Sequence, residues 1–157
     1  MSIDVKSVLD AFEPSLFVPQ LKSKDKTGVL REMIDRVQAA GIVRDARLLF
    51  AMLEQREGLG STGIGHGVAV PHGRSLAVPR LVAAFGRHQK GVDWGSVDEA
   101  PVHLVFLVLA PPLERSSRYL PFLGRIVEFV GDARRRDDLL ALEDYEDFQE
   151  KMRVALG

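Results

Sequence analysis

The sequence contains no cysteine among its 157 residues. This absence excludes a disulfide scaffold, a metal site built from thiolates and a cysteine nucleophile. Long apolar runs are absent too, since the longest one, residues 104–110, is far too short to cross a bilayer. Residues 1–6 include an early aspartate and lack the apolar stretch of a secretory signal. Together these absences predict a cytoplasmic protein without membrane insertion.

An excess of charge of one sign is also missing. The chain has 21 basic and 22 acidic residues, and its formal net charge is -1. That balance provides no electrostatic attraction to nucleic acids or anionic membranes, so we expect neither as a partner. Apolar residues make up 46% and charged residues 27%, which are ordinary values for a globular protein. With no repeat and no linker, the sequence predicts a single domain over residues 1–157.

Helices are predicted from aspartate caps and from apolar residues at helical spacing. The expected ranges are residues 4–11, a helix from a cap at Ser23 or Asp25 to about residue 40, residues 45–58, residues 120–130, and two shorter helices that begin at Asp132 and Asp144. Arg56 falls in the last turn of the 45–58 helix, on its apolar side. In the 120–130 helix the apolar stripe is predicted to comprise Leu120, Leu123, Ile126, Val127 and Val130.

Strands are predicted at residues 15–18, 68–72, 81–87 and 102–109, with a turn at 89–91 that places His88 on the surface. Pro71 cannot donate to a ladder and is expected to interrupt pairing just before His72. The continuous apolar run 102–109 is typical of a central strand buried on both faces, and His103 is expected to be structural there. Because helices and strands do not alternate strictly, the predicted fold class is α/β (α+β mixed), a mixed β-sheet flanked by helices.

Residues 56–74 carry the chemistry. Five glycines between positions 58 and 67 indicate backbone that adopts unusual dihedrals or is closely approached. Beside them lie the hydroxyls of Ser61 and Thr62, the guanidinium groups of Arg56 and Arg74, and the imidazole of His72. A neutral imidazole is nucleophilic near pH 7, and hydroxyls, arginines and backbone N–H groups stabilise a phosphoryl group in transit. This set predicts a histidine that accepts and releases a phosphoryl group.

The segment 63–74, Gly-Ile-Gly-His-Gly-Val-Ala-Val-Pro-His-Gly-Arg, preceded by Arg56 and Ser61-Thr62, resembles the signature of a known family. It is the fructose/mannitol/nitrogen-regulatory (type-2) IIA family of the phosphotransferase system, and the resemblance extends over nearly the whole chain. The resemblance implies that His72 accepts phosphate from the phosphocarrier HPr or its nitrogen-branch relative, and that Arg56 lies in the active site. The further phosphate-binding residues it points to are Ser61, Thr62, Gly63 and Tyr119.

One position departs from the family pattern. The family commonly has a second active-site histidine just before the leucine that opens the late helix, and this chain has Tyr119 there. A tyrosine hydroxyl can donate one hydrogen bond but carries no positive charge near neutral pH. His66, in the glycine loop, is the candidate to compensate. The departure raises two alternatives to a full relay: a slower regulatory variant and a degenerate module that binds without accepting phosphate.

The absence of a fused IIB or membrane IIC domain favours a stand-alone nitrogen-regulatory IIA whose phosphorylation state gates its contacts. The alternative is a sugar-transport IIA that passes phosphate to a fructose or mannitol IIB. The expected partners are thus an HPr-like phosphocarrier and either a IIB domain or regulated target proteins. The residue set requires no metal and no cofactor.

Simpler interpretations exist for each site residue. His72 fits a structural histidine at a strand end, Arg56 fits a cation at the negative end of a helix, and Arg74 fits a solvated surface cation.

Two other binding motifs do not match the sequence. Val68 stands where a dinucleotide-binding loop needs glycine, and the four histidines lack the spacing of a metal motif.

Overall fold

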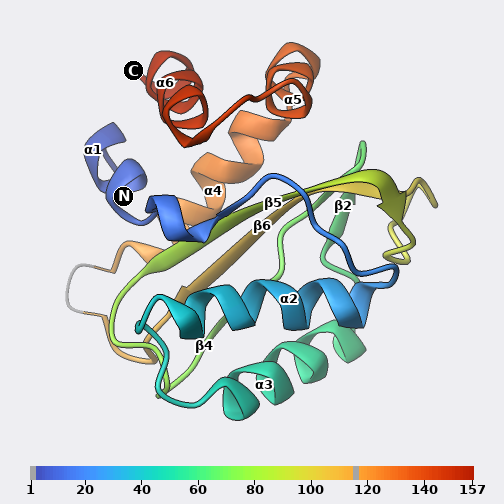
Figure 1. The fold of residues 1–157 in the computed structure, drawn as a ribbon. Helices are drawn as coiled ribbons and strands as arrows, with labels where there is room; N and C mark the ends of the chain where they lie inside the picture. The colour runs from blue at the N-terminus through green and yellow to red at the C-terminus, as the bar shows by residue number, and fades with distance from the viewer. Residues whose placement is uncertain (1–2, 115–116) are drawn as a thin grey trace.

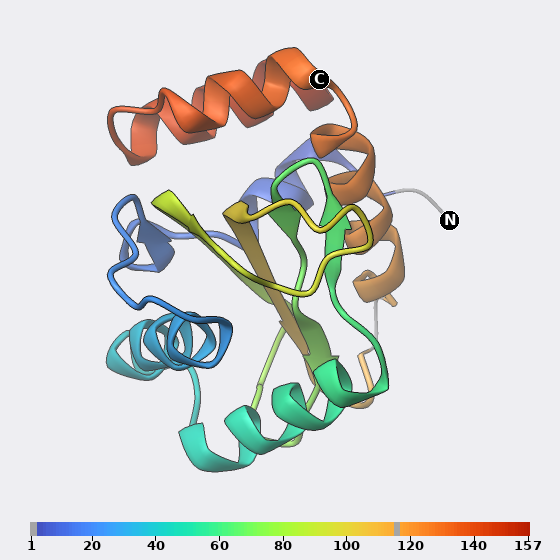
Figure 2. The ribbon, with the colours of Figure 1, turned by 90° about the vertical axis from the view of Figure 1, so that its right-hand side faces the viewer.

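The computed structural model describes residues 3–114 and 117–157, in which a mixed sheet lies between two layers of helices (Figure 1). One face is covered by α2 (Lys26–Ala39) and α3 (Ala46–Leu59). The other face is covered by α1 (Val5–Asp10), α4 (Tyr119–Val130), α5 (Ala133–Leu140) and α6 (Tyr145–Leu156), as the turned view shows (Figure 2). The predicted fold class, a mixed sheet flanked by helices, is confirmed.

The sheet is built around its longest antiparallel pair. Its strands are β1 (Phe17–Val18), β2 (Gly63–Gly65), β3 (Val68–Ala69), β4 (His72–Arg74), β5 (Val82–Val92) and β6 (Val102–Ala110). The order is β1-β5-β6-β3-β2, and β4 also pairs with β6. β5 runs antiparallel to β6, whereas β3 and β4 run parallel to it, so β6 is the central strand that its apolar sequence predicts.

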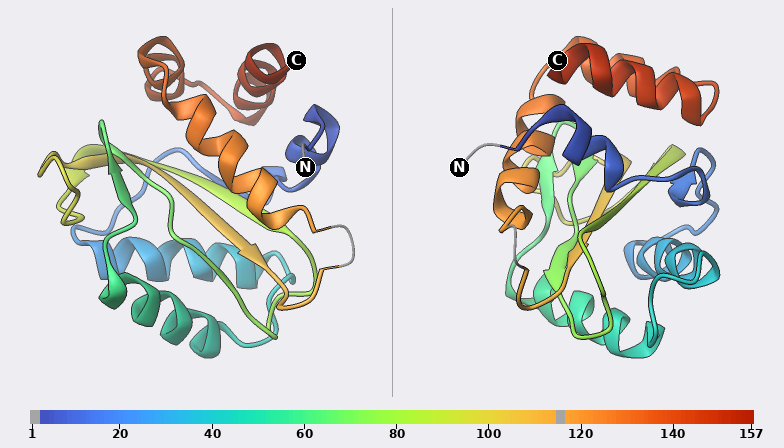
Figure 3. Two further views of the ribbon diagram at one scale, coloured as in Figure 1. Left: turned by 180° about the vertical axis from the view of Figure 1, so that it is seen from behind. Right: turned by 90° about the vertical axis from the view of Figure 1, so that its left-hand side faces the viewer.

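Alternate residues of β6 enter two separate cores, because successive side chains of a strand point to opposite faces. Val105, Leu107 and Leu109 pack with α2 and α3. Leu104, Phe106 and Val108 pack with the helices of the other face. That second core holds a cluster of six phenylalanine rings whose centroid distances run from 4.9 to 6.4 Å: Phe12, Phe17, Phe85, Phe106, Phe122 and Phe148. Near it α1 and α6 lie side by side (Figure 3).

Helix starts follow the predicted caps. The side chains of Asp25, Asp45, Asp132 and Asp144 each accept hydrogen bonds from backbone N–H groups in the first turn of the following helix. Of the two candidates for α2, Asp25 is therefore the cap. Gly41 follows α2 with φ of 76°, a left-handed conformation that favours glycine at this position.

The predicted turn at residues 89–91 is wrong, because β5 continues through it. Arg87 pairs with Leu104 and Val92 with Val102, so four β5 residues lie opposite one residue of β6. The extra residues form a bulge, and β5 continues beyond it to Val92. Gly91 lies in the bulge with a φ of 87°, a left-handed conformation that favours glycine. The bulge also buries His88, whose Nε2 donates to the Ser23 carbonyl at 2.8 Å and whose Nδ1 accepts from the Gly91 N–H at 3.0 Å. The predicted surface position of His88 is therefore wrong too.

The predicted apolar stripe of the late helix is partly wrong. Leu120 and Val127 are 66% and 47% exposed. The buried face instead comprises Tyr119, Phe122, Ile126, Phe129 and Val130. Phe122 belongs to the phenylalanine cluster, and seating its ring there rotates α4 so that Tyr119 points inward at the start of the helix.

The expected interruption at Pro71 is confirmed, since the predicted strand 68–72 is two short strands, β3 and β4. The other short strand also differs from the prediction, because residues 14–16 form a 3₁₀ turn that leaves only Phe17–Val18 as β1. β4 lies directly against α3. A Cβ on Gly73 would collide with the end of the Met52 side chain, so the glycine allows this helix to approach the strand that carries His72.

We expect Gly73→Ala to lower the free energy of unfolding by no more than about 1 kcal/mol, because the new methyl group displaces only the flexible end of the Met52 side chain. Gly124→Ala is the control. A Cβ at that position in α4 meets nothing within 4 Å, and alanine in place of a helical glycine stabilises by roughly 0.5–1 kcal/mol. Urea unfolding of both variants measures the difference, and two variants equally as stable as the parent would contradict the packing described.

Candidate functional site

The tautomer of His72 is set by the backbone two residues earlier. The Nδ1 atom of His72 lies 2.6 Å from the carbonyl oxygen of Val70, so Nδ1 carries the proton and donates it to that oxygen. In the neutral imidazole the lone pair then belongs to Nε2. Within residues 3–114 and 117–157, Nε2 has no hydrogen-bond partner, and the ring is only half-buried. His72 is thus a nucleophile presented with one defined nitrogen.

Arg74 and Tyr119 lie beside His72. His72 and Arg74 are two residues apart on β4 and therefore share a face of the strand. The Tyr119 ring, at the first position of α4, lies 6.4 Å from the His72 ring between centroids. The guanidinium carbon of Arg74 lies 4.7 Å from the centre of the same tyrosine ring.

Arg56 lies in the last turn of α3. Its Nη1 donates to the carbonyl oxygen of Gly60 at 2.9 Å, which orients the side chain at the helix end. The contact fits the simpler interpretation, in which a cation complements the negative end of a helix. It leaves most of the guanidinium N–H groups free for a second role, so the two interpretations are compatible.

Burial raises the pKa of Tyr119 to about 12, against the opposing effects of the Arg74 and Arg56 guanidinium groups, which lower it. The hydroxyl therefore stays protonated, and remains a donor, throughout the neutral pH range. Both arginines therefore act electrostatically on this hydroxyl, and the Arg74 guanidinium also stacks on the Tyr119 ring next to His72. The site is cationic and rich in donors, as an anion-binding site requires.

The glycine loop uses its own hydroxyls to hold itself together. Ser61 Oγ donates to the Trp94 carbonyl at 2.9 Å and accepts from the Gly63 N–H at 3.0 Å. Thr62 Oγ1 is hydrogen-bonded to the Glu57 carboxylate and accepts from Trp94 Nε1 at 3.1 Å. The loop lies between α3 and β3, before His72 in the chain. Contacts of Ser61, Thr62 and Gly63 with a phosphoryl group stay a prediction.

Glu57 is a residue that the sequence analysis missed. Its side chain is only 8% exposed and forms an ion pair with Lys26 Nζ at 2.5 Å. Lys26 also donates to the Trp94 carbonyl at 3.2 Å, so α2, α3 and the loop around Trp94 meet at one carboxylate. The lysine is 31 positions away from Glu57 in the sequence, and nothing local indicates the pair.

His66 does not reach His72. It lies at the turn between β2 and β3 with φ of 57°, and its N–H donates to the Asp98 carboxylate at 2.8 Å. The neighbouring Gly67 carbonyl accepts from Leu104, whereas His72 pairs with Val108, four residues or about 13 Å further along β6. The expectation that His66 compensates for the missing histidine is therefore wrong.

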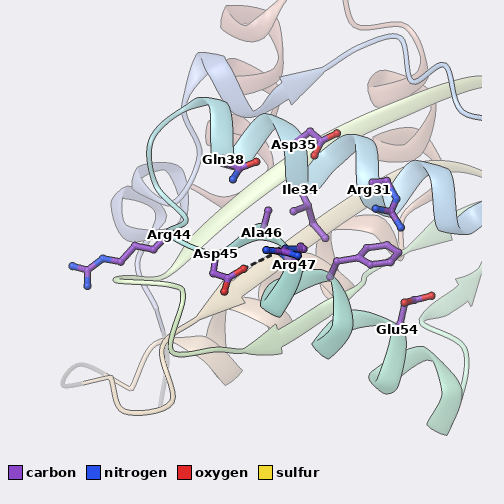
Figure 4. Close-up of a pocket in the computed structure, with 10 residues that line it drawn as sticks. Arg31, Ile34, Asp35, Gln38, Arg44, Asp45, Ala46, Arg47 and Glu54 are labelled. Atoms are coloured by element: carbon purple, nitrogen blue, oxygen red, sulfur yellow. Dashed lines mark hydrogen bonds between the residues drawn. The ribbon is translucent and has the colours of Figure 1, made fainter.

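Other hollows and clusters lie apart from this site. A cavity of about 720 Å³ opens between α2 and α3, where the Arg31 guanidinium stacks on Phe50 amid acidic and basic side chains (Figure 4). None of the residues around His72 lines it. In the part of the chain that the structure describes, no three His, Asp or Glu side chains are grouped to hold a metal ion. No helix there is both long and apolar enough to span a bilayer.

Comparison with known proteins identifies the family of the chain. A family model described as "Phosphoenolpyruvate-dependent sugar phosphotransferase system, EIIA 2" matches residues 10–153. The chain belongs to this EIIA-2 family. The resemblance drawn from residues 56–74 is thereby confirmed.

Individual relatives of this EIIA-2 chain span both branches of the family. It is 35% identical over 138 residues to a nitrogen regulatory protein of Bradyrhizobium diazoefficiens, covering 87% of this chain and 88% of that protein. It is 30% identical over 125 residues to a fructose-specific EIIA component of Haloferax volcanii, covering 80% of each. The crystal structure of nitrogen regulatory protein IIA-Ntr from Neisseria meningitidis matches with a TM-score of 0.86 and 26% identity, covering 93% of this chain and 99% of that chain.

The buried ion pair predicts a stability effect. We expect Glu57→Gln to lower the free energy of unfolding by about 2–4 kcal/mol, because Lys26 loses its partner in a partly desolvated position. The matched control is Glu150→Gln, which breaks an exposed pair with Arg153 and changes stability by less than about 1 kcal/mol. Urea unfolding compares the two variants. Equal effects would show that the Glu57 pair does not anchor the loop.

The raised pKa of Tyr119 predicts a late titration. In the Tyr145→Phe variant Tyr119 is the sole tyrosine, and its phenolate absorbance should appear with a midpoint near pH 12 instead of the ordinary value of about 10. The stabilisation linked to this proton is complete below about pH 10 and is lost as the pH rises toward 12. A midpoint near 10 in the folded protein would contradict the burial of this hydroxyl.

Proposed function

We propose that this EIIA-2 protein carries a phosphoryl group on Nε2 of His72, which it accepts from an HPr-like phosphocarrier. The observation that supports this most directly is the hydrogen bond from Nδ1 to the Val70 carbonyl, which leaves Nε2 as the nucleophile. The proposal places the protein in the cytoplasm, where such a carrier would meet it.

The proposed step is a transfer between two histidines. The Nε2 lone pair attacks phosphorus while the P–N bond to the donor's imidazole breaks, and the electron pair of that bond returns to the donor nitrogen. The proton on Nδ1 of His72 stays in place, so the phosphorylated ring gains positive character. The Val70 carbonyl oxygen, 2.6 Å from Nδ1, stabilises that charge.

Two side chains are proposed to stabilise the phosphoryl group. Arg56 supplies a guanidinium whose geometry matches phosphoryl oxygens, and Tyr119 supplies a hydroxyl donor. The backbone of the glycine loop at Ser61, Thr62 and Gly63 is proposed to support the group from the other side, with the hydroxyls fixing the loop. These roles agree with the family resemblance, with the position of the Tyr119 ring 6.4 Å from the His72 ring, and with the electrostatic effect of Arg56 on the Tyr119 hydroxyl.

Three exposed leucines close in sequence to the site residues support docking of a partner protein. Leu59 is 83% exposed and follows Arg56 by three residues, Leu76 is 85% exposed and follows Arg74 by two, and Leu120 is 66% exposed and directly follows Tyr119. Large apolar side chains that stay exposed near a reactive residue favour contact with another protein. We propose that the HPr-like donor docks here.

We propose the nitrogen-regulatory branch, in which phosphorylation of His72 gates contact with target proteins. Two relatives named as nitrogen regulatory proteins support it, one by sequence and one by structure. Adding a doubly charged group among exposed leucines would change both the charge and the desolvation cost of such a contact. The second candidate is a sugar-transport EIIA that passes phosphate to a IIB domain, and the fructose-specific relative favours it.

Incubation with phosphoenolpyruvate, the general kinase of the system and either its sugar-type or its nitrogen-type carrier tests the proposal. Intact mass measured under alkaline conditions should show a single phosphate, which His72→Ala abolishes and His66→Ala leaves unchanged. Arg56→Ala should slow labelling roughly 10- to 100-fold. This effect is smaller than the one expected when a buried oxyanion donor is removed, because Arg56 is partly exposed to solvent. The carrier that labels faster identifies the branch.

Labelling retained in His72→Ala would overturn the proposed acceptor. A folded protein that takes no phosphate from either carrier would instead identify a module that only binds.

A further inference from the structure

Arg74 occupies a position that its interpretation as a solvated surface cation does not explain. Its guanidinium is held on two sides. One face stacks on the ring of Tyr119 at 4.7 Å, and Nη1 donates to the Pro112 carbonyl at 3.1 Å. A freely solvated arginine has neither restraint. The side chain is therefore ordered before any ligand arrives, which lowers the entropic cost of binding one.

The charge of Arg74 is not neutralised by an acid. In the ranges 3–114 and 117–157, neither Arg74 nor Arg56 has a carboxylate within ion-pair distance. The nearby acid, Glu114, which lines a cavity of about 530 Å³ together with Arg74, instead faces Arg118 at 3.6 Å and the Tyr119 N–H at 3.2 Å. Two uncompensated guanidinium groups beside a nucleophilic imidazole are typical of a site for a doubly charged anion.

We propose that Arg74 is a second phosphoryl-binding residue, and that the ring of Tyr119 is the positioning residue that holds its guanidinium toward His72. The inference rests on the proposed phosphorylation of His72. Of the five N–H donors of an arginine, one is taken by Pro112 and the others are available to phosphoryl oxygens. Arg56 and Arg74 together then match the two negative charges that the group brings.

This assignment explains how the site works with tyrosine at the first position of α4. Tyr119 contributes no charge, since it stays neutral, but its ring face attracts a cation. The positive charge comes from Arg74 on β4, two residues after His72. Helix α4 contributes the Tyr119 ring, on which the guanidinium of Arg74 stacks. The arrangement uses one aromatic residue for two tasks: its hydroxyl donates, and its ring positions Arg74.

The test compares phosphorylation rates in three variants of the full chain, with the carrier that labels the parent. Arg74→Gln should slow labelling of His72 about tenfold, a modest effect because the cation is exposed. Arg74→Lys should fall between Arg74→Gln and the parent, since it keeps the charge and loses the planar fork. Arg134→Gln, the same change on α5 outside the site, should label like the parent.

The positioning role of Tyr119 is tested by coupling. Tyr119→Phe keeps the ring under Arg74, whereas Tyr119→Leu removes it. Arg74→Gln should therefore slow labelling about tenfold in the Phe background and less than about twofold in the Leu background, a non-additivity that loss of fold stability alone would not produce. Melting curves confirm that each variant is folded.

If His72 is labelled and Arg74→Gln labels as fast as Arg134→Gln, the inference is wrong while the proposed function stands. Equal effects of Arg74→Gln in the Phe and Leu backgrounds would overturn the positioning role. If His72 is not labelled in the parent, the proposed function itself fails, and this inference fails with it.

Discussion

A single hydrogen bond, from Nδ1 of His72 to the carbonyl of Val70, determines what the rest of the site can do. It arises from three consecutive residues. Pro71 has no N–H, so the strand breaks between β3 and β4. The chain resumes pairing at His72, whose ring lies back over Val70. The same break that disturbs the sheet thus leaves Nδ1 bonded to the backbone and the lone pair on Nε2.

The remaining site residues come from elements on opposite sides of the sheet. Arg56 belongs to α3, which packs on one face and approaches β4 closely because Gly73 has no side chain. Tyr119 belongs to α4, which packs on the other face through the phenylalanine cluster. The Tyr119 ring lies 6.4 Å from the His72 ring, and Arg56 acts electrostatically on the Tyr119 hydroxyl. The buried pair between Glu57 and Lys26 fixes the loop that leads from α3 into this region.

Local features of the sequence were sufficient for much of this structure. Aspartate caps located the starts of four helices, the apolar run 102–109 identified the central strand, and Pro71 located the break before His72. These features depend on neighbours in the chain, or on burial of a whole run, and so can be predicted from one sequence. The order of predicted helices and strands indicated the fold class, and the family resemblance, carried by residues 56–74, agreed with it and assigned roles to His72 and Arg56.

The errors have a common physical origin in contacts between distant segments. Residues 89–91 have the composition of a turn, but β5 continues to pair with β6 on both sides of them, so they form a bulge within the strand. This bulge buries His88 against Ser23. The orientation of α4 depends on where Phe122 fits, which the helical period alone does not determine. The position of His66 depends on the register of β3 against β6, and the restraint on Arg74 depends on an aromatic ring 45 positions later.

The central claim is that the backbone presents His72 with its proton on Nδ1 and its lone pair on Nε2. Nitrogen-15 NMR of the histidine rings, at about pH 8, above the pKa of a free imidazole, tests this directly. The signals of His72 are assigned by their loss in His72→Gln. The structure predicts a protonated Nδ1 and an unprotonated Nε2 for this residue. A proton on Nε2, or an equal mixture of the two tautomers, would contradict the account.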